Sequence, residues 1–294
     1  MATTEPEELQ PARPDVRGER PTYLPRLPWR WILSIGLFLT LSIGTCQIRD
    51  RQETEALRAT VLKAYGDQLG PVAARYQKLV ATIRDHTVAA GKRDAPETHA
   101  DPRLAFASLG TTKGVYLRLP AANATDPKQI AGAAAELPPD AIGRCLGVAP
   151  ASAAELMARG SFLEKEWIQR AHDADSVLKL RVVAEELRQR GLRDLPMVAE
   201  AVSAGWFMLV LERGDNRRDA PVDVYLWELA TDKLLLSSRI KAEGGLVAAR
   251  IAVGGVKPGR YADQAQTGAA QDCSIASQLK ALVGEATAQR GSKP

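Results

Sequence analysis

The chain has 294 residues, of which 45% are hydrophobic and 25% are charged, and its formal net charge is +4. These values are typical of a folded protein and exclude a wholly disordered chain. No segment is dense in lysine and arginine, so we expect no nucleic acid among the partners. Three cysteines are too few for a small scaffold held together by disulfides.

The first part of the chain predicts a tail followed by a membrane segment. Residues 1–28 are rich in proline and charge, which is typical of a disordered segment and predicts a cytoplasmic tail. The next 18 uncharged residues, Trp31 to Ile48, would span about 27 Å as a helix, close to the apolar thickness of a bilayer. Trp29 and Trp31 can lie at the headgroup level. We therefore predict a transmembrane helix over residues 29–48, retained as a single-pass anchor in the lipid bilayer.

Two alternatives to a retained anchor remain open. The end of the run, Ile43-Gly44-Thr45-Cys46, resembles the lipoprotein box of bacterial lipoproteins, although that family usually has Gly, Ala or Ser where Thr45 stands. The resemblance implies that the run is cleaved and that Cys46 carries the lipid. Ordinary cleavage of a secretory signal is the second alternative.

The expected topology follows from the lengths of the two flanking segments. The segment before the run is short, whereas the long segment after it can be translocated largely regardless of its charge. We expect a cytoplasmic N-terminus and an exported C-terminal domain, periplasmic or extracellular, at the inner membrane.

Residues 49–92 predict two short juxtamembrane helices. The break between them is expected at Gly66–Gly70, because Pro71 suits the first turn of a new helix. Apolar residues recur at helical spacing on both sides of this break, and packing on the main domain is favoured over a free stalk. Residues 93–102 are polar and contain proline, so a linker is expected there. The apolar positions are Leu57, Val61 and Leu62, then Tyr76, Leu79, Val80 and Ile83.

The exported domain is expected over residues 103–290, with residues 291–294 as a disordered C-terminus. It opens with a strand over 114–119, whose Val115, Leu117 and Leu119 alternate onto one face. Helix signals dominate residues 151–204, including a capping-box spacing between Ser152 and Glu155. A helix over 175–190 is predicted to have its apolar face at Leu178, Val182, Leu187 and their neighbours.

The apolar period then changes to two, which predicts strands over 206–212, 222–229 and 234–240. Short connections favour an antiparallel meander, with its first strand buried on both faces. Residues 246–253 are a weaker fourth strand, and a final helix is expected over 272–288 with Ile275, Leu279, Leu282 and Val283 on one stripe. Helices followed by strands indicate the α+β class, with helices packed on an antiparallel meander sheet.

No catalytic, cofactor-binding or metal site is predicted, and no cofactor is expected. Cys145 and Cys273 both lie in the part expected to be exported, where two cysteines tend to pair if the fold brings them together. Buried thiols are the alternative. The three histidines, His86, His99 and His172, lack the spacing of a zinc site.

Residues Gly214-Asp215-Asn216-Arg217 resemble the GDNR box of bacterial signal peptidases, which also have an N-terminal anchor. That family needs a nucleophilic serine in an S-M-x-P context just after the anchor, and residues 47–75 contain no serine. Without a nucleophile beside a base, the peptidase interpretation is rejected, and a polar loop between strands explains the motif.

The sequence therefore favours a membrane-anchored bacterial envelope protein whose exported domain acts in binding or assembly, with an envelope protein or wall component as partner. A lipoprotein anchored through Cys46 is the nearest alternative. The alternative of another class is an envelope enzyme with a carboxylate site, for which the candidate acids are Glu164, Glu166, Asp173 and Asp175. Acids on helix faces are usually only solvated, so catalysis is not expected.

Overall fold

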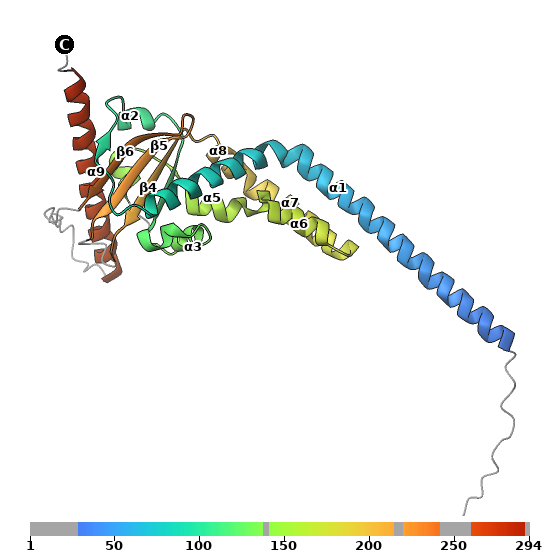
Figure 1. Cartoon of the computed structure of the whole chain (residues 1–294). Coiled ribbons are helices and arrows are strands. Elements are labelled where there is room, and N and C mark those ends of the chain that lie inside the picture. The colour runs from blue at the N-terminus through green and yellow to red at the C-terminus, as the bar shows by residue number, and fades with distance from the viewer. Residues whose placement is uncertain (1–28, 138–140, 215–219, 242–259, 292–294) are drawn as a thin grey trace, which may run out of the picture. The chain divides into compact units, whose positions relative to one another are not determined.

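The computed structural model describes residues 29–137, 141–214, 220–241 and 260–291 (Figure 1). The chain forms two units, Met1–Gln52 and Glu53–Pro294. The predicted tail over 1–28, the candidate strand over 246–253 and the end of the chain from residue 292 lie outside the described residues. Within the described residues, no helix offers a segment long and apolar enough to cross a bilayer.

Helix α1, Trp29–Gly91, is continuous, so the predicted break between two juxtamembrane helices is wrong. Pro71 lies inside the helix, where it costs one backbone hydrogen bond. The buried stripe of α1 nevertheless continues across it, with Tyr65 and Leu69 before the proline and Ala73 and Tyr76 after it. Packing of one uninterrupted face against the core outweighs the local helix-breaking signals. The favoured alternative, packing of this region on the main domain, is confirmed for the part of α1 beyond residue 53.

The sheet has six strands in the order β1-β6-β5-β4-β2-β3. The predicted meander is confirmed, because β5 pairs antiparallel with both β4 and β6. The sheet as a whole is mixed, since β2 pairs parallel with β4 and with β3. A long helical connection separates β2 from β4, which is what a parallel pair requires. The strands are β1 (His99–Ala100), β2 (Gly114–Pro120), β3 (Ala151–Ser152), β4 (Trp206–Glu212), β5 (Val222–Glu228) and β6 (Lys233–Ile240).

Helices cover both faces of the mixed sheet, so the fold is of the α+β class (Figure 1). The two covered faces form two separate apolar layers. The described helices and helical turns are α1, α2 (Phe106–Leu109), η1 (Ala121–Thr125), α3 (Ile130–Ala135), α4 (Ile142–Leu146), α5 (Ala153–Arg159), η2 (Gly160–Leu163), α6 (Lys165–Asp173), α7 (Val177–Arg193), α8 (Leu195–Ala201) and α9 (Arg260–Gly291). One layer packs residues of α1 and α5–α8 on the sheet, and the other packs α2, α4 and α9. Alternate residues of β5 enter opposite layers, as predicted: Val224 and Leu226 on one side, Tyr225 and Trp227 on the other.

A close approach explains the glycine that begins β2. Gly114 pairs with Trp206 across the β2–β4 ladder. A Cβ atom at residue 114 would lie 2.0 Å from Cε2 of the Trp206 ring, so the indole occupies the space that any larger residue would need. The same indole donates its Nε1–H to the carbonyl of Leu109, at 3.2 Å, which ties α2 to the sheet.

The segment 93–102, predicted as a linker, is part of the sheet. It contains β1, which pairs antiparallel with β6. The Ser237 hydroxyl donates to the carbonyl of Glu97 at 2.6 Å, and Arg213 donates to the carbonyl of Arg93 at 2.7 Å. A two-residue strand is too short to give an alternating pattern, so its polar composition indicated a loop.

Helix α9 is held on the sheet by apolar and charged contacts. The predicted stripe is confirmed, since Ile275, Leu279 and Val283 are buried. At the start of this stripe, Arg118 of β2 forms a buried ion cluster: it donates to Glu212 at 2.7 Å and to Asp272 of α9 at 2.8 Å. We refer to Arg118, Glu212 and Asp272 as the buried triad. Each charge has an opposite charge within hydrogen-bond distance, which is the condition for keeping charges inside a core.

Candidate functional site

Helix α7 presents large apolar side chains to solvent. Leu178 is 73% exposed, Val182 62% and Leu192 73%, whereas Leu180 and Val183 are buried. The predicted apolar face at Leu178 and Val182 is therefore wrong. The helix carries apolar residues on two sides. The side that contains Leu180 and Val183 is the buried one, and Val183 belongs to the same core cluster as residues of α1.

An apolar groove lies between α1 and α7, with a cavity volume of about 620 Å³. We call it the α1–α7 groove. Its floor includes Val61 and Leu69, which are buried, and its rim includes exposed Leu192. The lining side chains are mostly apolar: Leu57, Thr60, Val61, Ala64, Gln68 and Leu69 of α1, Ala184, Leu187, Arg188, Gly191 and Leu192 of α7, and Leu195 of α8.

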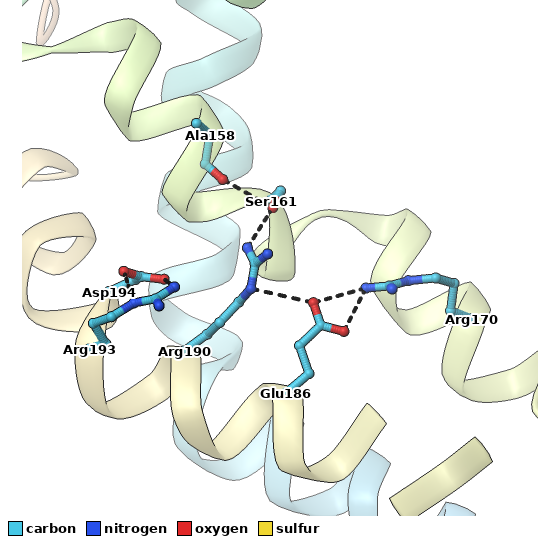
Figure 2. Close-up of polar contacts among 7 residues, drawn as sticks. All are labelled: Ala158, Ser161, Arg170, Glu186, Arg190, Arg193 and Asp194. Carbon is cyan, nitrogen blue, oxygen red and sulfur yellow. Dashed lines mark hydrogen bonds and ion pairs between the residues drawn. The ribbon is translucent and has the colours of Figure 1, made fainter. Parts of the chain in front are cut away.

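A polar network fixes α7 opposite the groove (Figure 2). Glu186 of α7 lies 3.3 Å from Arg170 of α6 and 3.3 Å from Arg190 one turn along α7. Arg190 donates to the Ser161 hydroxyl at 2.9 Å, and Ser161 donates to the carbonyl of Ala158 at 3.2 Å. The network joins α7 to α6 and to the end of α5, so one wall of the groove is held in place.

The polar rim of the groove is also fixed. Arg188 donates to Glu185 at 2.7 and 2.9 Å. These hydrogen bonds, with one from Gln189, lower the pKa of Glu185 to about 2. In the last turn of α7, Arg193 lies 2.9 Å from buried Asp194, and its hydrogen bonds lower the pKa of that carboxyl (Figure 2). The groove therefore combines an apolar floor with rim charges that are already paired.

The candidate acids of the enzyme alternative do not share one set of contacts. Glu164 lies 3.4 Å from Arg84 of α1, and Asp173 accepts a hydrogen bond from Gln169 at 2.9 Å. Asp175 pairs with Lys179, whose hydrogen bond lowers the pKa of Asp175. A general acid needs a raised pKa, so this shift has the wrong direction for that role. Glu166 lies exposed in the first turn of α6, where the helix dipole stabilises a negative charge.

The histidines are spread over three elements. His86 of α1 stacks on Trp227, with ring centroids 4.5 Å apart, and its Nε2 lies 2.7 Å from the Asp232 carboxylate. His99 lies in β1 and His172 is exposed on α6. Across residues 29–137, 141–214, 220–241 and 260–291, no group of three or more His, Cys, Asp or Glu residues could hold a metal ion.

The structure brings Cys145 of α4 and Cys273 of α9 together, with their Cα atoms 5.1 Å apart and their sulfur atoms joined. The link adjoins the buried triad, since Cys273 follows Asp272. The side chain of Cys46 lies outside the described part of the structure. So do Asp215, Asn216 and Arg217 of the GDNR segment.

We predict that Cys145 and Cys273 are disulfide-bonded in exported protein, and that the bond stabilises the fold by about 2–4 kcal/mol. Counting alkylated thiols in a Cys46→Ser background, with and without reductant, measures the pairing. We expect no free thiol before reduction and two after it. Two free thiols in protein recovered from outside the cytoplasm would contradict the prediction.

No protein-family model matches the chain, and no curated protein or solved structure is significantly similar to it. The groove and the exposed face of α7 are therefore interpreted from their geometry alone.

One pattern in the sequence of α7 indicates the groove. Ala184, Leu187 and Gly191 follow helical spacing beside the stripe of Leu180 and Val183, so α7 is apolar over more than half its circumference. Such a helix contacts more than one neighbour, which a single-face interpretation misses.

Proposed function

We propose that this chain is a single-pass envelope protein, anchored in the inner membrane by residues 29–48, whose exported domain binds another envelope protein through the α1–α7 groove. The observation that carries the binding role is the groove itself, an apolar channel with a 73% exposed leucine, Leu192, at its rim.

The sequence supports the anchor and its orientation. The run from Trp31 to Ile48 has no charge and a length close to the apolar thickness of a bilayer. The pairing of Cys145 with Cys273 supports an exported domain, because disulfides persist in oxidising compartments and are rare in the cytosol.

The dimensions of the groove favour a helical partner. Leu57 and Leu69 line its two ends on α1, and twelve helical residues extend about 18 Å, or roughly three turns. An amphipathic helix that carries apolar residues at i, i+3 or i+4 and i+7 fits such a groove. The paired rim charges leave apolar burial as the main favourable term.

Photocrosslinking in native membranes tests the binding role. A photoreactive amino acid at Leu192 should give a discrete crosslinked product, and Ala184→Glu should abolish it by placing a charge in the groove. The matched control places the photoreactive residue at Glu285, an exposed position on α9. Products that are equal from the two positions, or absent from Leu192, would refute groove binding.

Separate measurements test the anchor. A reporter that is active only outside the cytoplasm, fused after Pro294, should be active, and the protein should resist alkaline extraction from membranes. Metabolic labelling with a fatty acid distinguishes the lipoprotein alternative, since only that alternative predicts a label lost in Cys46→Ser. Soluble mature protein that starts after Gln47 without an acyl group would exclude both anchors.

A further inference from the structure

The α1–α7 groove does not account for all of the exposed apolar surface of α7. Leu178 and Val182 are 73% and 62% exposed, one helical turn apart, and neither lines the groove. They lie in the first turns of α7, next to the connection from α6. We call residues 173–182 the α6–α7 tip.

The α6–α7 tip is tied to the part of α1 nearest the proposed anchor. Arg58 donates to the carbonyl of Ala174, in the connection between the two helices, at 2.7 Å. Farther along, Tyr65 stacks on Trp167 of α6, with ring centroids 5.0 Å apart. The tip therefore cannot move away from residue 58 without breaking buried contacts.

Chain length limits how far the tip can be from the membrane. Arg58 is ten residues after Ile48, where the uncharged run ends. Ten residues extend about 15 Å as a helix and at most about 35 Å when fully extended. Under the proposed anchor, the bilayer surface is thus within reach of the tip, and it is an apolar partner that is always present.

The charges of the tip suit a headgroup region. Lys179 directly follows Leu178, Arg181 directly precedes Val182, and both basic residues are exposed. Asp175 is paired with Lys179 at 2.9 Å, and Asp173 accepts from Gln169, whereas no carboxylate among the described residues pairs with Arg181. Apolar side chains beside basic ones are typical of segments that lie at a membrane interface.

We propose that the α6–α7 tip inserts Leu178 and Val182 into the surface of the bilayer that holds the anchor, as a second, interfacial contact of the exported domain. This inference rests on the proposed anchor. The contact would limit the tilt of the domain and so present the α1–α7 groove at a fixed height above the membrane.

Photolabelling from the lipid side tests this contact in the full chain. The protein is reconstituted in vesicles of phosphatidylethanolamine and phosphatidylglycerol that contain a phospholipid with a diazirine in its acyl chain. Lipid adducts are then mapped by peptide mass spectrometry. Adducts within residues 31–49 report the anchor, and adducts within residues 171–188 report the tip.

We expect adducts in both segments of the native protein. Leu178→Glu combined with Val182→Glu should lower the adduct yield at the tip by about tenfold or more, since each buried apolar side chain contributes at least that factor. The yield in the anchor should not change. Leu192→Glu is the matched control, because it alters an equally exposed leucine of the same helix and should leave the tip yield unchanged.

The outcomes separate the two proposals. Adducts in the anchor without adducts at the tip would overturn the interfacial contact and leave the anchor intact. Absence of adducts in residues 31–49 would overturn the anchor. A tip yield that Leu192→Glu lowers as much as the double variant would also overturn the contact, because the effect would then not depend on Leu178 and Val182.

Discussion

Replacing Arg118 with methionine is expected to lower the free energy of unfolding by about 3–5 kcal/mol. Methionine keeps much of the volume of the arginine stem but removes the cation of the buried triad. Glu212 is 9% exposed and Asp272 1% exposed, so both carboxylates would lose their ion pair with Arg118 inside the protein. Chemical denaturation of the full chain in detergent, followed by circular dichroism, measures the loss.

A triple variant identifies the cause of this loss. The triple variant that also carries Glu212→Gln and Asp272→Asn should recover most of the stability, because it removes all three charges of the buried triad. Arg181→Met, at an exposed arginine, is the control and should unfold like the native protein. A triple variant that is as unstable as Arg118→Met would contradict an electrostatic cause.

Replacing Trp167 with alanine is expected to cost about 3–5 kcal/mol. Trp167 is 1% exposed, and its ring stacks on Tyr65 of α1 at a centroid distance of 5.0 Å. Removal of the indole leaves a cavity between α6 and α1. Helix α6 leads into the α6–α7 tip, and α1 forms one wall of the α1–α7 groove. The midpoint of chemical denaturation measures the loss.

A conservative variant separates packing from hydrogen bonding at this position. The Nε1–H of Trp167 is buried and has no hydrogen-bond partner within the described residues. Phenylalanine keeps an aromatic ring against Tyr65 and removes the unpaired donor, so Trp167→Phe should cost clearly less than Trp167→Ala. Equal losses for the two variants would contradict a stabilising role of the aromatic ring stacked on Tyr65.

Both variants also bear on function. Trp167→Ala weakens the attachment of α6 to α1, so it should reduce crosslinking from Leu192 if the groove requires its present shape. Arg118→Met acts on the opposite face of the sheet, where α9 docks. At a temperature at which both variants remain folded, only the first should affect the groove.

The pattern of side chains along each segment determined much of the fold. The strands β4, β5 and β6 follow from short apolar runs with turn residues between them. The division of β5 between two faces follows from a period of two, because successive strand residues point to opposite sides. The stripe of α9 follows from the helical period in the same way. The class of fold and the presence of two apolar layers were therefore predictable from local patterns.

The sequence also identified two cysteines that could pair and one uncharged run that could enter a membrane, since these depend only on residue type and length. The sequence did not show which apolar side of α7 is buried, and it did not show that α1 continues past Pro71. Those outcomes depend on which surfaces meet: contact with the core stabilises α1 across the proline, and packing of Val183 into the same core leaves Leu178 and Val182 exposed. The groove, the buried triad and the approach of Cys145 to Cys273 join residues distant in the chain, so only the tertiary structure decided them.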